Sequence, residues 1–161
     1  MEDPIRLHLL KGVRQFVESA SQVEGVLKIA MIGSLTTEKV NPKDADVLVT
    51  IDKDVDIDRL AMFGRKLKGH GQHRNLGADI FLCNVEGEYL GRTCSFRECH
   101  FRVRCQGSRC DEGTRIQDDF ENLRLDKQTI LNPPLELWPT LAKRRPVPSD
   151  VEEFFFQVPT Q

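Results

Sequence analysis

Apolar residues in the N-terminal segment recur at the three- and four-residue spacing of an amphipathic helix. The positions concerned are Ile5, Leu9, Val13, Phe16 and Val17. Asp3 is a suitable cap for this helix and Pro4 a suitable first residue, because the first turn leaves its amide hydrogens unbonded and proline has none. We therefore expect a helix from Pro4 to about residues 19–21.

Three shorter apolar runs predict the core strands of a sheet. They span residues 27–32, which are followed by Gly33, residues 44–51 and residues 78–83. The distal part of the second run is apolar on both faces, which is typical of a strand in the middle of a covered sheet. Residues 88–105 are expected to add one or two strands, since apolar and charged residues alternate there.

A second amphipathic helix is expected between the second and third strands. Its apolar stripe consists of Ile57, Leu60, Ala61, Gly64 and Leu67. Asp56 or Asp58 is placed to cap this helix, and Gly69 and Gly71 are expected to end it, because glycine favours the positions that follow a helix. The helix should pack against the sheet through its apolar stripe.

The C-terminal part of the chain gives weaker patterns. A short helix is expected from Ile116 through Phe120 and Leu123. Residues from about 132 to 161 contain most of the prolines and predict an extended arm, within which a brief helix runs from Ser149 through Phe156. Together the elements predict a single domain of the α/β (α+β) class over residues 1–161, with a short mixed sheet backed by helices.

The composition is that of an ordinary globular protein. Of the 161 residues, 39% are hydrophobic and 30% charged, and the net charge is −2. This balance gives no global attraction to nucleic acid or anionic lipid, so such a partner would need a local patch. No apolar window approaches the roughly 18 residues that span a bilayer, and the N-terminus lacks an export signal. We expect a cytoplasmic protein without a membrane partner.

Two acidic residues begin the second strand on the same face. Strand side chains repeat every two residues, so Asp44 and Asp46 point to one side and Ala45 and Val47 to the other. Two neighbouring carboxylates repel and raise each other's pKa, a cost that a bound divalent cation removes. The pair therefore predicts a metal site, for which Mg²⁺ is the first choice and Mn²⁺ the alternative.

A Gly-Ser pair between the first two strands suits a phosphate ligand. Gly33 allows the backbone to approach a ligand closely, and Ser34 offers a hydroxyl and an amide. Lys39 and Lys43 stand between this turn and the two aspartates, where they could neutralise phosphate charge or remain solvated. A metal site and a phosphate site next to each other together predict that the chain binds a metal–nucleotide complex.

These residues resemble the nucleotidyltransferases of the DNA polymerase beta superfamily, in particular its small, minimal-type members. The signature of that superfamily is an apolar residue, Gly, Gly or Ser, a gap of about nine to thirteen residues, and then acid-apolar-acid-apolar. Here residues 32–34 and Asp44-Ala45-Asp46-Val47 fit it, with residues 35–43 as the gap. Asp79 has the sequence context of the third acid of the family. The resemblance covers roughly residues 27–84 and implies the polymerase beta-like fold.

The resemblance also implies a reaction. A nucleoside monophosphate would pass from an NTP, with ATP the first choice, to an acceptor hydroxyl on a small molecule, a protein or RNA. Asp44 and Asp46 would hold the metal ions that bridge the triphosphate. Asp79 would either complete the metal site on the acceptor side or take the proton of the attacking hydroxyl. Gly33, Ser34 and Lys43 would bind the nucleotide.

Two other interpretations remain open. The acids could be ordinary capping and strand-edge residues, or the chain could be a noncatalytic nucleotide- or partner-binding module. Small members of the superfamily include partners in toxin–antitoxin pairs, which is consistent with the second possibility. The proline-rich arm and Phe154-Phe155-Phe156 would then dock on a partner protein or on a second copy of the chain.

The cysteines define a further candidate site. Five cysteines without an export signal predict reduced thiols. Cys94, Cys99, Cys105 and Cys110, with His100, provide ligand types that zinc prefers, but their spacings of four, five and four residues depart from common zinc motifs. Structural zinc is thus the alternative to buried thiols.

Overall fold

The computed structural model of the chain describes residues 2–95, 97, 115–117 and 125–156, and these form a sheet with helices on both faces. The helices are α1 (Ile5–Ala20), α2 (Ile57–Gln72), α3 (Lys127–Leu131) and α4 (Ser149–Phe156), with a short 3₁₀ helix η1 (Gly33–Thr36). The strands are β1 (Val26–Ile32), β2 (Asp44–Ile51), β3 (Gly77–Cys83), β4 (Tyr89–Thr93), β5 (Ile116–Gln117), β6 (Leu135–Trp138) and β7 (Ala142–Lys143).

The sheet is mixed, as the sequence predicts. Its seven strands lie in the order β5-β4-β3-β2-β1-β6-β7 over the described residues. Strands β2 and β3 are parallel and are joined through α2, whereas the neighbouring pairs β1 with β2 and β3 with β4 are antiparallel. Parallel neighbours need a crossover connection, which explains why the long helix α2 stands between these two strands.

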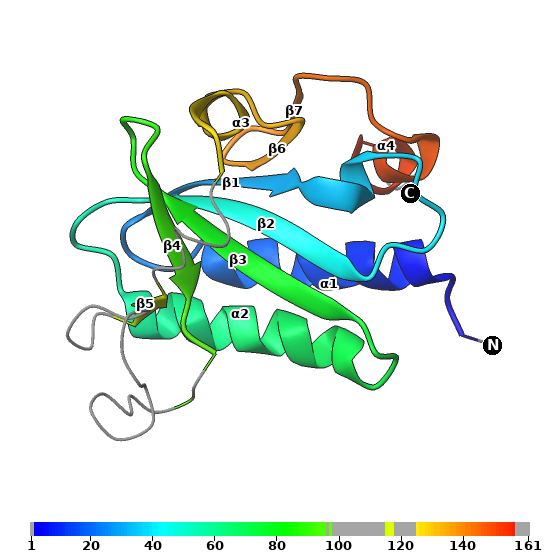
Figure 1. Cartoon of the computed structure of the whole chain (residues 1–161), viewed down its shortest axis with the longest axis horizontal. Coiled ribbons are helices and arrows are strands. Elements are labelled where there is room, and N and C mark those ends of the chain that lie inside the picture. The colour runs from blue at the N-terminus through cyan, green and yellow to red at the C-terminus, as the bar shows by residue number, and fades with distance from the viewer. Residues whose placement is uncertain (1, 96, 98–114, 118–124, 157–161) are drawn as a thin grey trace, which may run out of the picture.

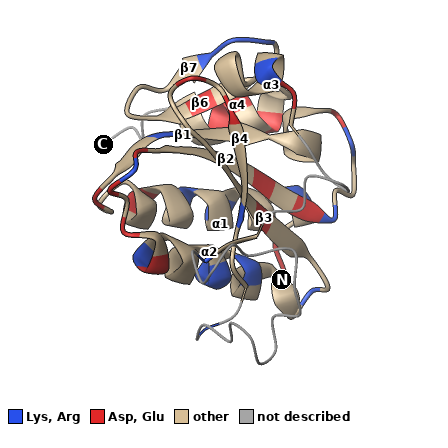
Figure 2. Cartoon of the chain, turned by 60° about the vertical axis from the view of Figure 1, so that its left-hand side comes forward, with Lys and Arg blue, Asp and Glu red and all other residues tan. Residues whose placement is uncertain are grey.

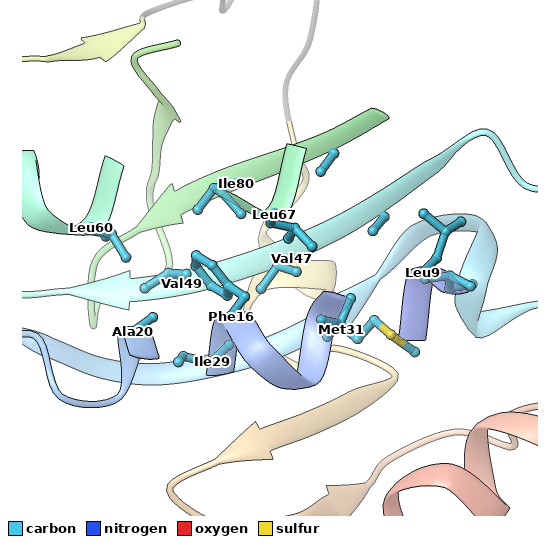
Figure 3. Packing of buried hydrophobic residues seen from close by; sticks show 14 of the residues in the cluster. Leu9, Phe16, Ala20, Ile29, Met31, Val47, Val49, Leu60, Leu67 and Ile80 are labelled. Atoms are coloured by element: carbon cyan, nitrogen blue, oxygen red, sulfur yellow. The ribbon is translucent and has the colours of Figure 1, made fainter. Parts of the chain in front are cut away.

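Alternation along the central strands directs residues to two different cores. Val47, Val49 and Ile80 point to the face covered by α1 and α2, where they meet Phe16 and Leu60 (Figure 3). The opposite face carries a smaller cluster that contains Ala30, Leu48, Phe81, Tyr89 and, from α3, Ile130. Figure 1 shows α1 and α2 running side by side along one face of the sheet. Two covered faces account for the continuous apolar run at the end of β2.

The apolar stripes expected for the two long helices are confirmed, but the ends of these helices differ in part from the expectation. Pro4 rather than Asp3 occupies the cap position of α1, and the carboxylate of Asp3 instead binds Lys11 Nζ at 2.8 Å. Asp56 caps α2 by accepting a hydrogen bond from the amide of Arg59 at 3.3 Å. The cap of α1 thus differs from the sequence expectation, and that of α2 follows one of the two alternatives.

Helix α2 continues through Gly69 and Gly71, where the sequence predicted its end. His8 Nε2 donates to the carbonyl of His70 at 2.7 Å, and His70 Nε2 donates to the carbonyl of His8 at 2.8 Å, with the two rings stacked at 4.0 Å. Packing between α1 and α2 therefore outweighs the cost of a glycine in a helix, which is about 1 kcal/mol.

Two expectations for the C-terminal part are wrong. Ile116–Gln117 form strand β5 against β4 instead of starting a helix, while Phe120 and Leu123 lie outside the described residues. The proline-rich segment is not a free arm, because β6 pairs with β1 and Leu135 is fully buried. Proline is tolerated next to a short strand, so a count of prolines does not exclude pairing. The final helix, α4, is present as expected.

Within the described parts of the chain, no helix has the length and apolar character needed to cross a bilayer. Of the strands expected in residues 88–105, β4 is confirmed, and residues 98–105 lie outside the described residues.

Candidate functional site

Three acidic residues lie on the sheet face that points away from α1 and α2. Their strand neighbours Ala45, Val47 and Ile80 belong to the core on the helix side, so the alternating positions Asp44, Asp46 and Asp79 face the other way. In the parallel pair β2 and β3, Asp46 is the register partner of Asp79. Figure 2 marks the acidic positions of these neighbouring strands in red. The fold thus brings together acids that are 33 residues apart in the chain.

Gly33 is held against the second of these acids. Ile32, the last residue of β1, pairs with Asp46, so the turn that follows passes over its carboxylate. Gly33 has a φ of +78°, and a Cβ atom at this position would collide with Asp46 Oδ2. Both the backbone conformation and the close approach require glycine here. A Gly at this position is therefore explained by its contact with a site residue.

Gly77 has a similar relation to Asp44, which sequence reasoning did not detect. The two residues are register partners, and a Cβ on Gly77 would collide with Asp44 Oδ1. The amide of Gly77 also donates to the carbonyl of Lys43 at 2.8 Å. A glycine at the start of the third apolar run was the available signal, but its partner becomes evident only from the register.

The environment of Asp46 disfavours its charged form. Burial, followed by the charges of Asp79 and Asp44, raises the pKa of Asp46 to about 7, and the charge of Arg92 opposes this shift. Asp46 is half-buried and Asp44 is exposed. A carboxyl that titrates near neutral pH and lies among other acids is well placed to receive a cation.

Arg92 is a site residue that the sequence patterns do not single out. Its Nη1 binds Asp79 Oδ1 at 2.7 Å, and the side chains are 24% and 32% exposed, respectively. Arg92 pairs in the β3–β4 ladder with Phe81, two residues beyond Asp79 on the same face. The third acid thus has a basic partner supplied by the next strand.

The other nucleotide-binding candidates lie around the first two acids. Ser34 is half-buried in η1, and its carbonyl accepts from the amide and the hydroxyl of Thr37 at 3.1 and 2.8 Å. Lys43 directly precedes β2 and is exposed. The loop from η1 to β2 is fixed by Arg6, whose guanidinium donates to the carbonyls of Leu35 and Lys39, both at 2.8 Å.

A pocket of about 140 Å³ lies where β3 and β4 meet α2. Asp79 and Arg92 line it together with Thr93, Ser95 and Gln117, and α2 contributes Arg65 and Lys68. The pocket is mostly polar. It lies on the α2 side of the sheet, whereas the Asp79 carboxylate belongs to the opposite face.

The zinc prediction falls largely outside the described residues. Cys94 is buried, and Cys99, His100, Cys105 and Cys110 are not described. Where side chains are described, no group of three or more His, Cys, Asp or Glu residues has an arrangement that would hold a metal ion.

The chain belongs to a family of unknown function, DUF6932, whose profile matches residues 1–128. The matched region includes all three acids, Gly33 and Arg92. Comparison with curated proteins found no match, and comparison with solved structures found none either.

Proposed function

We propose that this member of the DUF6932 family is a nucleotidyltransferase that uses a divalent cation, with the polymerase beta-like fold that its motif implies. The observation that carries the proposal is the placement of Asp46 in register with Asp79 and directly beneath Gly33. The order of helix, strand, Gly-Ser turn, acidic strand, helix and second acidic strand supports the same fold.

Asp44 and Asp46 suit a divalent cation. Their carboxylates are hard oxygen ligands. The raised pKa of Asp46, about 7, reflects its burial and then the charges of Asp79 and Asp44, a cost that a cation would relieve. Mg²⁺ needs few protein ligands because water and substrate phosphates complete its shell, and Mn²⁺ accepts the same oxygen ligands. When bound, the ion would neutralise triphosphate charge and orient the phosphates.

The turn at Gly33 and Ser34 supports nucleotide binding next to these acids. The absence of a side chain at Gly33 keeps the backbone close to Asp46, so a phosphate on the cation would also lie close to the turn. Lys43 stands one residue before Asp44 and is exposed, which allows it to reach a triphosphate. ATP is the nucleotide to test first.

The reaction requires positioning and charge neutralisation more than a covalent protein intermediate. The oxygen of an acceptor hydroxyl attacks the α-phosphorus, the bond from that phosphorus to the pyrophosphate oxygen breaks, and pyrophosphate leaves. Asp79 lies on the strand next to Asp46 and is suited to the acceptor side of the site. The acceptor, whether a small molecule, a protein or RNA, and the cytoplasmic location stay predictions.

Transfer of label from each α-³²P-labelled NTP tests the proposal. The protein is incubated with a cell extract and Mg²⁺ or Mn²⁺, and wild type is compared with Asp44→Asn/Asp46→Asn. We expect wild type alone to label an acceptor. Equal labelling by the double variant, or no labelling with any nucleotide by the folded wild type, would contradict the proposed activity.

A noncatalytic binding module is the second candidate, favoured by an apolar groove at the N-terminal end of α1. Its volume is about 690 Å³, and it is lined by Ile5, Val40 and Phe154 among others, with Val40 76% exposed. Phe154 and Phe155 are half-buried, and Arg14 lies 4.2 Å from the Phe154 ring, so the aromatic triplet is not a fully exposed patch.

Thermal unfolding separates the two candidates. A nucleotide site predicts that Mg-ATP raises the melting temperature of wild type and that Asp46→Asn abolishes this shift, because ligands stabilise the state that binds them. A module that binds only a partner protein or a second copy predicts no shift with any NTP.

A further inference from the structure

The arginine on β4 changes the expected role of the third acid. Arg92 Nη1 lies 2.7 Å from Asp79 Oδ1, and both side chains are at least two-thirds buried, with exposed fractions of 24% and 32%. Charge-assisted bonds of this length are stronger than neutral ones. A cation that used Asp79 as a ligand would have to displace the guanidinium or accept it as a close neighbour.

The sheet fixes this pair in place. Phe81 on β3 is the register partner of Arg92 on β4, and Asp79 precedes Phe81 by two residues on the same face. Diagonal neighbours in an antiparallel ladder are within reach of a long side chain. The pair therefore depends on strand register and not on a loop conformation.

Arg92 acts on Asp46 as well, but through space. Its charge opposes the shift that burial and the two other acids impose on the Asp46 carboxyl. Arg92 Nη1 binds the Asp79 carboxylate directly. The guanidinium thus pairs with one carboxylate and influences Asp46 through its charge.

We propose that Arg92 is a positioning residue that keeps Asp79 out of the coordination shell of the cation. The inference rests on the proposed function, since it assigns the cation to Asp44 and Asp46 alone. The positive charge of Arg92 keeps the bound cation away from Asp79. Asp79 is then available as the acceptor of the hydroxyl proton.

This division of roles leaves Asp79 for the acceptor side of the site. The acceptor hydroxyl passes its proton to the Asp79 carboxylate as its oxygen bonds to the α-phosphorus and pyrophosphate leaves. The Arg92 side chain stays charged throughout and holds Asp79 in position.

Mn²⁺ binding to the full-length protein, followed by electron paramagnetic resonance without nucleotide, tests the inference. We measure the Kd for wild type, Asp79→Asn, Arg92→Ala and the double variant. If Asp79 acts on the cation only through its charge at long range, Asp79→Asn should weaken Mn²⁺ binding to a similar extent in wild type and in Arg92→Ala. We expect instead that Asp79→Asn changes the Kd by less than about threefold in wild type but by about tenfold or more in Arg92→Ala, because only there is the carboxylate free to coordinate.

Arg92→Lys provides the matched variant. It keeps the charge but loses the planar fork, so its Kd should lie between those of wild type and Arg92→Ala. Circular dichroism and thermal unfolding check that each variant is folded. If Arg92→Ala does not fold, the same cycle in the Arg92→Lys background still has to show a larger effect of Asp79→Asn than wild type does.

The outcomes separate this inference from the proposed function. A large loss of Mn²⁺ binding on Asp79→Asn in the wild-type background, equal to that in Arg92→Ala, overturns the role of Arg92 and leaves the metal site intact. Binding that is insensitive to Asp46→Asn, or absent from wild type and Arg92→Ala alike, overturns both. Binding that first appears in Arg92→Ala and needs Asp79 supports the role of Arg92 while it contradicts a resident metal site in wild type.

Discussion

At the scale of single residues, Asp46 combines a structural cost with a proposed ligand role. Its carboxyl is half-buried, is in register with Asp79 and lies beneath Gly33, and its pKa is raised to about 7. Groups that destabilise the folded protein when charged are common in binding sites, because the ligand removes the cost. Substitution of Asp46 tests the cost of its buried charge, and substitution of Gly33 tests the close contact between the two residues.

Asp46→Asn should stabilise the protein at about pH 8. The folded protein binds the Asp46 proton more tightly than the unfolded chain, whose pKa is near 3.8, so the stabilisation from protonation is complete below that value and is lost as pH rises through about 7. Asparagine does not ionise, and we expect a gain of about 1–3 kcal/mol at about pH 8 that shrinks toward about pH 4.

Urea unfolding across this pH range measures the effect. Asp54→Asn, at an exposed loop position, is the control and should leave the profile of wild type unchanged. A gain for Asp46→Asn that is the same at every pH would contradict the shifted titration.

Gly33→Ala should destabilise the protein by about 1–3 kcal/mol, because the left-handed backbone and the collision with Asp46 both disfavour a side chain. Gly69→Ala is the control, since Gly69 is exposed in α2 and a Cβ there meets no atom within 4 Å. Alanine favours helices, so this variant should be about 0.5–1 kcal/mol more stable than wild type. Similar melting temperatures for the two variants would argue against a special role of Gly33.

At the scale of elements, Arg6 connects three parts of the chain around the proposed phosphate turn. Its guanidinium lies in α1, donates to the carbonyls of Leu35 and Lys39, and binds Asp150 of α4 at 2.8 Å. The turn after Gly33 is thus held by a helix from each end of the sequence. The position of the turn depends on α4, although α4 itself contributes none of the candidate site residues.

Arg6→Ala should reduce both stability and nucleotide binding. Losing a part-buried arginine leaves two carbonyls and Asp150 without this donor, a loss of about 2–4 kcal/mol. Calorimetric titration with Mg-ATP should show a weaker Kd. Lys143→Ala is the control. Lys143 lies on β7 and pairs with Glu152 of α4, and this exposed ion pair contributes less than about 1 kcal/mol. Unchanged Mg-ATP affinity in folded Arg6→Ala would show that the contacts of Arg6 do not support nucleotide binding.

Strand β6 should be part of the folding unit rather than an appendage. Leu135 is fully buried against the sheet, so Leu135→Ala should cost about 2–5 kcal/mol. Leu131→Ala, four residues earlier and 43% exposed, should cost less than about 1 kcal/mol. Denaturant unfolding of both variants measures the difference. Equal, small effects would instead favour the extended arm that the prolines predict.

At the scale of the whole molecule, the sheet order explains why the site is assembled where it is. β2 and β3 are central neighbours, β1 brings the Gly-Ser turn to the other side of β2, and β4 brings Arg92 to the other side of β3. The candidate site thus draws on four consecutive strands of the sheet. Apolar residues below it, facing α1 and α2, keep these strands fixed.

Local patterns determined much of this arrangement in advance. The period of apolar residues placed α1, α2 and the three core strands within a few residues of their observed bounds, because one buried face per element leaves a regular trace in the sequence. The alternation of Asp44 with Ala45 and Asp46 with Val47 also assigned the acids to one face. Gly33 and Ser34 were identified from their position at the end of an apolar run.

Tertiary structure alone decided the contacts that cross between elements. The pairing of β6 with β1, the passage of α2 through two glycines, and the contacts of Arg92 with Asp79 and of Gly77 with Asp44 each join residues from different elements. A short strand beside prolines, or a single arginine on a strand, has no periodic signal of its own. Such residues take their place from register and packing, which depend on the free energy of the whole fold and not on local sequence.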